Sequence, residues 1–99
     1  MDANGYNDSI LQDIPDHRCF LCGRTTGKLD RHEIYHGAYR DKSKELGLWV
    51  TLCHPCHMTL HHLEPRLDKR LKRTGQSMAM RYYGWTVKKF IQEFGKNYI

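Results

Sequence analysis

Two pairs of cysteines, Cys19-x-x-Cys22 and Cys53-x-x-Cys56, constrain the fold of this chain more than any other feature. Each pair flanks a tight turn, and thirty residues separate the two pairs. Two such turns can close a tetrahedron of four sulfurs around one zinc ion. Cysteine then fills all four ligand positions and leaves none open for a substrate, so we expect this zinc to be structural rather than catalytic.

The length of the chain indicates that disulfides or a structural metal must add to the stability of its core. A domain of 99 residues, 39% of them hydrophobic, gains only marginal stability from its apolar core. The alternatives for the cysteines are free buried thiols, two disulfides or a C-x-x-C redox couple, and no βαβ pattern supports the redox couple. In a reducing compartment, metal binding is the favoured use of cysteines at this spacing.

Charge divides the chain into two parts. Residues 1–16 contain four aspartates and no lysine or arginine, so we expect a flexible acidic arm. Residues 17–99, which we expect to form a single domain, contain 16 Lys and Arg against seven Asp and Glu. A basic domain suggests a polyanionic partner such as nucleic acid. There is no apolar run of eighteen residues and no signal-peptide pattern in residues 1–16, so we expect a cytoplasmic protein that does not associate with membranes.

The hydrophobic pattern predicts two strands followed by helices, an α+β arrangement. The first segment has Leu29 and Ile34 as its apolar residues, the second is rich in residues that favour strands, and helical spacing begins after the last cysteine. The expected elements are a strand over 28–34, a loop over 36–43, a strand over 46–52, a helix after Cys56 that breaks near 63–64, a second helix that begins at Pro65 and ends at Gly75, and a helix capped by Thr86 and Gly95.

Six of the seven histidines fall between His32 and His62. His57 and His61 are four residues apart, so in a helix both imidazoles project from one face and can grip a divalent ion. His62 lies one residue further round, and spacing alone does not decide which of the two faces the site. A zinc ion that joins the cysteine pairs also brings His32-Glu33, at the end of the first strand, close to this helix. The sequence therefore predicts a second metal site.

The segment from Cys19 to His62 resembles the zinc-ribbon branch of the HNH endonucleases, in particular small phage and prophage members. The middle asparagine of the family's name is missing here, because all asparagines lie outside the matching segment. The resemblance rests on the two cysteine pairs, His32-Glu33-Ile34-Tyr35-His36-Gly37, Arg40 and Ser43 before Gly47-Leu48, Leu52-Cys53-x-x-Cys56-His57, and a closing Phe90-Ile91 with Phe94-Gly95-Lys96-Asn97-Tyr98.

This resemblance implies a ββα-metal (His-Me finger) core over residues 17–63, joined to the four-cysteine zinc ribbon, with additional C-terminal helices over 64–99. In that family a hairpin and one helix hold a catalytic Mg or Mn ion. The implied metal ligands are His57 with His61 and His62. His32 is then either the general base or a further ligand, with Glu33 in the place of the base.

The implied activity is hydrolysis of DNA phosphodiester bonds, one strand nicked per active site, by a monomer or weak dimer acting on double-stranded DNA. Arg40 and Arg31 near the hairpin, and Lys69 and Arg73 on the following basic helix, are the expected phosphate contacts; the alternative is that these are ordinary solvated charges. A non-catalytic zinc-ribbon module that only binds nucleic acid is the alternative function. It does not require the histidines.

Overall fold

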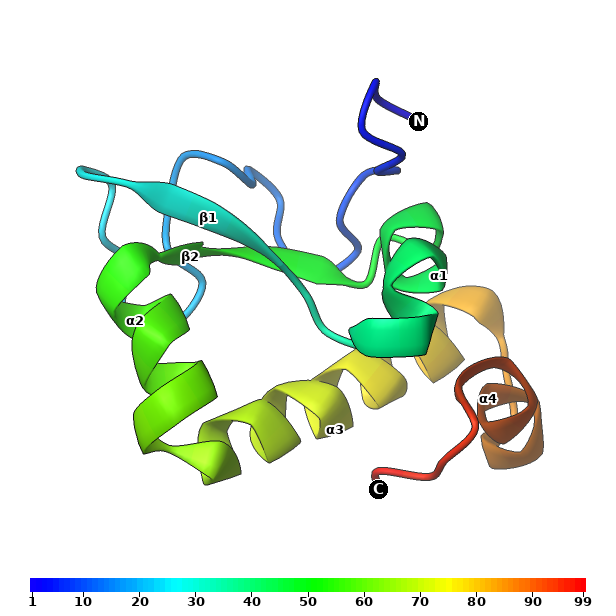
Figure 1. Ribbon diagram of the computed structural model, residues 1–99. Helices are drawn as coiled ribbons and strands as arrows, with labels where there is room; N and C mark the ends of the chain where they lie inside the picture. The colour runs from blue at the N-terminus through cyan, green and yellow to red at the C-terminus, as the bar shows by residue number, and fades with distance from the viewer.

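An antiparallel hairpin organises the rest of the chain (Figure 1). The computed structural model describes residues 1–99. Strand β1 (Leu29–Glu33) pairs with β2 (Trp49–Cys53), and this pairing sets His32 opposite Val50. Both strands expected from the sequence are therefore confirmed, within one residue at each end of β1 and at the end of β2, while β2 begins three residues later than expected. The molecule is a small α+β domain in which helices pack against a two-stranded sheet.

Helices fill most of the chain outside the hairpin. They are the 3-10 helix η1 (Gly37–Tyr39), α1 (Arg40–Glu45), α2 (His54–Met58), the π-helix η2 (Thr59–Leu63), α3 (Pro65–Tyr83) and α4 (Val87–Phe94). The expected loop over 36–43 is wrong, because η1 and α1 occupy most of it. Ser43 of α1 explains the difference: its hydroxyl donates to the Tyr35 carbonyl at 2.7 Å and accepts from the Tyr35 N–H at 3.0 Å, which folds the segment back onto the end of β1.

The expected end of the second helix at Gly75 is also wrong. Helix α3 begins at Pro65, as predicted, but continues to Tyr83 and ends where Gly84 adopts a left-handed conformation with φ of 68°. Gly75 lies where α3 crosses the end of β1. A Cβ atom there would lie 2.9 Å from the Tyr35 hydroxyl, so the missing side chain permits close packing rather than a stop.

Aromatic side chains form the centre of the core between the hairpin end and the last helix. The Tyr35 ring lies 4.5 Å from the Phe94 ring and 5.4 Å from the Phe90 ring, centroid to centroid. Helix α4 is confirmed with both of its predicted caps. The Thr86 hydroxyl accepts from the Lys89 N–H at 3.1 Å, and Gly95 has φ of 77°.

The N-terminal residues 1–16 do not extend away from the domain as a flexible arm. They contain no helix or strand, yet they cover the edge of β2 that β1 leaves unpaired. The Ser9 hydroxyl donates to the Trp49 carbonyl at 2.6 Å, and the Gln12 side-chain oxygen accepts from the Thr51 N–H at 2.7 Å. An open strand edge is a liability, and these polar side chains satisfy its backbone groups. Residue 16 is therefore not a boundary of the packed structure.

None of the helices combines the length and the apolar character needed to cross a lipid bilayer.

Candidate metal centres

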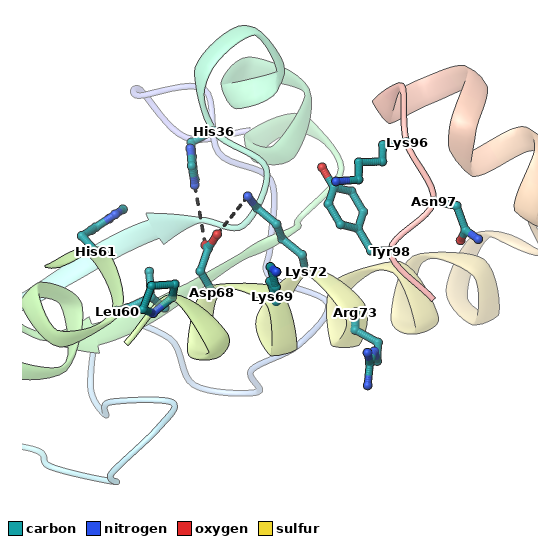
Figure 2. Close-up of a pocket in the computed structure, with 11 residues that line it drawn as sticks. His36, Leu60, His61, Asp68, Lys69, Lys72, Arg73, Lys96, Asn97 and Tyr98 are labelled. Carbon is teal, nitrogen blue, oxygen red and sulfur yellow. Dashed lines mark ion pairs between the residues drawn. The ribbon is translucent and has the colours of Figure 1, made fainter. Parts of the chain in front are cut away.

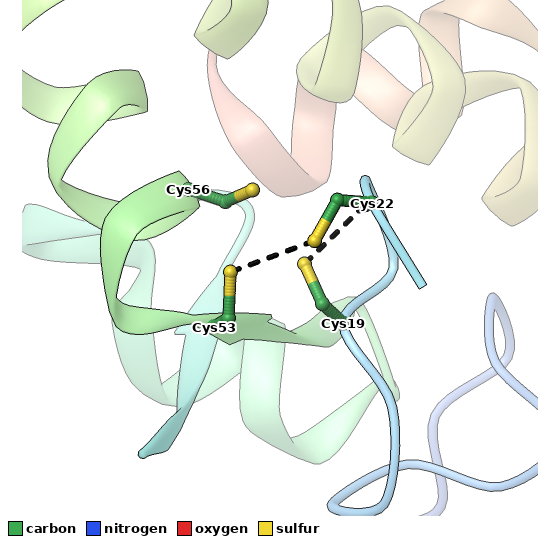
Figure 3. A group of neighbouring side chains, drawn as sticks. All are labelled: Cys19, Cys22, Cys53 and Cys56. Carbon is green, nitrogen blue, oxygen red and sulfur yellow. Dashed lines mark hydrogen bonds between the residues drawn. The ribbon is translucent and has the colours of Figure 1, made fainter. Parts of the chain in front are cut away.

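The four cysteines converge at one end of the hairpin (Figure 3). Cys19 and Cys22 come from the loop before β1, Cys53 ends β2, and Cys56 lies in α2. All four sulfurs lie within 4.8 Å of one another, and those of Cys22 and Cys53 are 3.6 Å apart. A zinc–sulfur bond of about 2.3 Å places neighbouring sulfurs of a tetrahedron about 3.8 Å apart. The cluster therefore fits one tetrahedral zinc ion.

Backbone groups around Cys19 favour the thiolate that a metal needs. Burial of the Cys19 thiol works to raise its pKa, but backbone N–H groups of Cys22, Cys53 and Leu21 outweigh that effect and lower the pKa to about 6. The thiol is thus already prepared to lose its proton at neutral pH.

Three histidines from three different elements form a second group, here called the imidazole group: His32 of β1, His57 of α2 and His61 of η2. One ring nitrogen of each lies within 4.8 Å of the other two. The Nε2 atoms of His57 and His61 are 3.1 Å apart. Two nitrogens bound to one transition-metal ion at about 2.1 Å lie about 3.0 to 3.4 Å apart. This geometry suits a shared cation.

His32 is the buried member of the imidazole group. Its side chain is only 3% exposed, and its Nε2 atom has no hydrogen-bond partner. Burial lowers the pKa of His32 to about 4, and the neighbouring His57 and His61 act in the same direction. His32 is therefore neutral at physiological pH, with a lone pair free for a cation. A buried polar atom without a partner is rare in proteins, and a bound cation would supply one.

Asp30 orients His57 of the imidazole group by contacting the ring nitrogen that faces away from His61. Its Oδ2 atom lies 3.2 Å from Nδ1 of His57 and 3.2 Å from Nδ1 of His54. Burial of the Asp30 carboxyl works to raise its pKa, but the contacts with His54 and His57 outweigh burial and lower it. Metal-bound histidines commonly place their other nitrogen against a carboxylate in this way. Asp30 was not expected as a site residue, although it lies two residues before His32 and hence on the same face of β1.

The two neighbouring histidines, both exposed, lie differently. His61 belongs to the imidazole group, whereas His62 does not, and its ring centroid lies 6.3 Å from that of His61. His62, expected as a ligand, lies outside the group.

Glu33, Arg31 of β1 and Arg40 of α1 also lie away from the imidazole group. Glu33 follows His32 and so projects from the opposite face of β1, where it accepts from the Tyr6 hydroxyl at 2.9 Å and from Arg40 Nε at 2.8 Å. On the same face, Arg31 pairs with Asp2 at 2.7 Å and Asp16 at 2.6 Å. These expected catalytic and phosphate-binding side chains are instead bonded to other residues of the protein, mostly in the N-terminal segment.

A cleft of about 560 Å³ opens beside the imidazole group and runs along α3 (Figure 2). His61 and His36 line one end, together with Asp68, whose Oδ1 atom lies 3.7 Å from His36 Nε2. Neither His36 nor Asp68 was expected as a site residue from the sequence. The cations that line the cleft are Lys69, Lys72, Arg73 and Lys96. Lys69 and Arg73, expected as phosphate contacts, thus line the same cleft as His36 and His61, unlike Arg31 and Arg40.

Comparisons of the chain with protein-family models, with curated proteins and with solved structures find no match.

Proposed function

We propose that this protein is a metal-dependent DNA endonuclease of the zinc-ribbon HNH type, which nicks one strand by hydrolysis of a phosphodiester bond. The observation that carries the proposal is the position of the imidazole group, three converging ring nitrogens beside a cleft lined by four cations. A structural zinc site alone would not need this second group. The imidazole group offers a site for a cation, and the cleft offers positive side chains for the strand. Metal-dependent phosphodiester hydrolysis uses both.

The residues of the imidazole group fit a transition-metal ion. Imidazole nitrogen binds Zn, Co and Ni more tightly than it binds Mn. It binds Mn more tightly than Mg, which prefers oxygen ligands. His32, His57 and His61 would hold the ion, and Asp30 would keep the His57 ring in place. When bound, the cation would neutralise charge that develops on the phosphate and stabilise the leaving oxygen. Of the two metals that the resemblance implies, we therefore propose Mn rather than Mg.

The geometry favours one of the two roles that the resemblance leaves open for His32. Its unpartnered Nε2 atom lies with the ligand nitrogens of His57 and His61, so we assign it as a metal ligand rather than the general base. Glu33 is turned to the opposite face and bonded to Arg40 and Tyr6. We therefore do not assign the role of base to Glu33.

Nicking of supercoiled plasmid tests the proposal. Zinc-loaded protein is incubated with plasmid in Mn, in Mg, and with no added divalent metal, and open-circular product is measured over time. We expect nicking in Mn, slower nicking in Mg, and none without added metal. His57→Ala and His61→Ala should each lose about 100-fold or more of the rate, because a ligand contributes at least as much as the residues that orient it. His62→Ala, a neighbouring exposed histidine, should nick at the wild-type rate.

Two results would count against the nuclease. One is intact plasmid with fully zinc-loaded protein that still binds DNA, which would support the non-catalytic zinc-ribbon module. The other is equal nicking by wild type and His57→Ala, which would assign the activity to a contaminant or to another site.

A further inference from the structure

The cleft beside α3 has two chemically different ends (Figure 2). At the histidine end, Asp68 directs its Oδ1 atom toward His36, and this oxygen is buried without a hydrogen-bond partner. Its other oxygen pairs with Lys72 Nζ at 2.9 Å. Toward the C-terminal end the lining side chains are cationic or neutral. One end therefore favours a cation, and the rest favours an anion.

The C-terminal residues form one wall of this cleft, and a buried glutamine holds them there. Gln76 of α3 is fully buried; its Nε2 atom donates to Asn97 Oδ1 at 2.8 Å, and its Oε1 atom accepts from the Tyr98 N–H at 2.6 Å. The Tyr98 ring then lies between two ammonium groups, 5.8 Å from Lys72 Nζ and 5.4 Å from Lys96 Nζ. Lys96 thereby lies beside α3 and lines the cleft together with the cations of that helix.

Most of these cations have no acidic partner inside the protein. Lys69, Arg73 and Lys96 form no ion pair with any acidic side chain, whereas Lys72 pairs with Asp68. Figure 2 shows Lys72 and Lys96 on the same side of α3 as Tyr98, while Arg73 extends to the other side of the helix. Unpaired cations held around a concave surface form a site for an anion with several charges in a row.

We infer that this cleft binds the phosphates of the nucleic-acid strand next to the cleaved bond, with Lys69 and Lys96 as the principal contacts and residues 95–99 as part of the binding site. The inference rests on the proposed function, because the imidazole group at the end of the cleft marks where the cleaved phosphate lies. It adds the C-terminal wall, which the expected phosphate contacts did not include. Gln76 acts as a positioning residue for that wall.

The test measures binding separately from cleavage. Fluorescence anisotropy with a labelled duplex oligonucleotide, in buffer without added divalent metal, gives affinity as a function of salt concentration. The double variant Lys69→Ala/Lys96→Ala is compared with Lys88→Ala/Lys89→Ala, which removes the same charge from the exposed surface of α4. Loss of two phosphate contacts should make the slope of log K against log salt shallower by about 1.8 and weaken binding about tenfold or more at low salt. The α4 double variant should keep the wild-type slope.

Folding controls and a variant that restores the charge accompany these binding measurements. Zinc content and circular dichroism verify that each variant is folded, and Lys69→Arg/Lys96→Arg should restore binding because it restores the charge. Equal loss of affinity in the two alanine double variants would overturn the inference, since binding would then follow net charge alone. Competition by a mononucleotide at the same concentration as the oligonucleotide would also overturn it, in favour of a small phosphorylated ligand.

The two proposals fail in distinguishable ways. Protein that binds the oligonucleotide through Lys69 and Lys96 but never nicks plasmid in Mn contradicts the nuclease and leaves the cleft assignment intact. Protein that nicks plasmid but binds equally well without these two lysines contradicts only the cleft assignment.

Discussion

The Nδ1 atom of His57 and the Oδ2 atom of Asp30 lie 3.2 Å apart, so a carboxylate on β1 fixes the orientation of an imidazole on α2. The Nε2 atom of His57 lies 3.1 Å from the Nε2 atom of His61. Strand β1 thus contributes two side chains to this site: His32 is a member of the imidazole group, and Asp30 holds the ring of His57.

Replacement of Asp30 should weaken metal binding at the proposed second site without unfolding the protein. Asp30→Ala removes the acceptor that holds Nδ1 of His57, and loss of such an orienting carboxylate typically costs about 10–100-fold in metal affinity. Titration calorimetry of the zinc-loaded protein with Mn or Ni measures the effect. Asp41→Ala, an exposed aspartate on α1, is the matched control and should bind as wild type does. Unchanged affinity in Asp30→Ala would mean that His57 is positioned by backbone packing alone.

Loss of one cysteine should abolish cooperative folding. Cys53 is 2% exposed and lies where the end of β2 joins the four-cysteine cluster. In small zinc domains the free energy of metal binding is a large part of the free energy of folding. We expect Cys53→Ser to lose its zinc, measured by elemental analysis, and its sharp thermal unfolding transition. The wild type should lose the same transition with a strong chelator and regain it when zinc is added back. A chelated protein with an unchanged melting temperature would contradict a structural role for the metal.

Glu33 should matter for stability and not for cleavage. Burial works to raise the pKa of Glu33, but donation from Arg40 and Tyr6 outweighs burial and lowers the pKa below its usual 4.5. In the pH range just below 4.5 the unfolded chain therefore binds more protons than the native protein. The ionised Glu33 carboxyl contributes to the free energy of unfolding above this range, and this contribution is lost as the pH falls through the native pKa.

The corresponding variant is Glu33→Gln. Its melting temperature should lie below that of wild type at pH 7, and the difference should shrink as the pH falls below the usual 4.5 and through the lowered native pKa of Glu33. Its rate of plasmid nicking should equal that of wild type, because Glu33 faces away from the imidazole group. Loss of nicking in a variant that remains folded would return Glu33 to the catalytic site.

Gly75→Ala should destabilise the protein even though alanine is the better helix former. In an open helix this change would stabilise by about 1 kcal/mol, but here the new Cβ would lie 2.9 Å from the Tyr35 hydroxyl and 3.1 Å from a methyl carbon of Ile34. We expect a lower melting temperature by differential scanning calorimetry. Ser77→Ala, at an exposed position of the same helix, should be neutral or slightly stabilising. A higher melting temperature for Gly75→Ala would show that the Tyr35 side chain moves aside easily.

The parts of the site that could be predicted are those that follow from local spacing. The two C-x-x-C turns and the pair His57 and His61 each depend on residues a few positions apart, and the structure brings both sets together. The choice of His61 over His62 could not be made, because it depends on the π-helical turn that begins at Thr59.

Long-range packing accounts for most of what was missed. Gly75 follows the local rule for a helix end, yet contact with Tyr35 overrides it. Asp68 and His36 meet only because α3 crosses beneath the end of β1, and no spacing in the sequence indicates that crossing. The N-terminal residues have the composition of an unstructured arm, but the free edge of β2 supplies backbone partners that composition does not reveal.

Cys56 and His57 are adjacent in the chain, so one peptide bond joins a residue of the four-cysteine cluster to a residue of the imidazole group. With zinc in the cluster, α2 is anchored before the imidazoles can converge, and the two metals would load in a fixed order. The first ion would be acquired during folding and retained for the life of the protein, while the second would exchange with the free metal of its surroundings. Scarcity of zinc would then reduce the amount of folded protein, whereas scarcity of the second metal would reduce only the activity of each molecule.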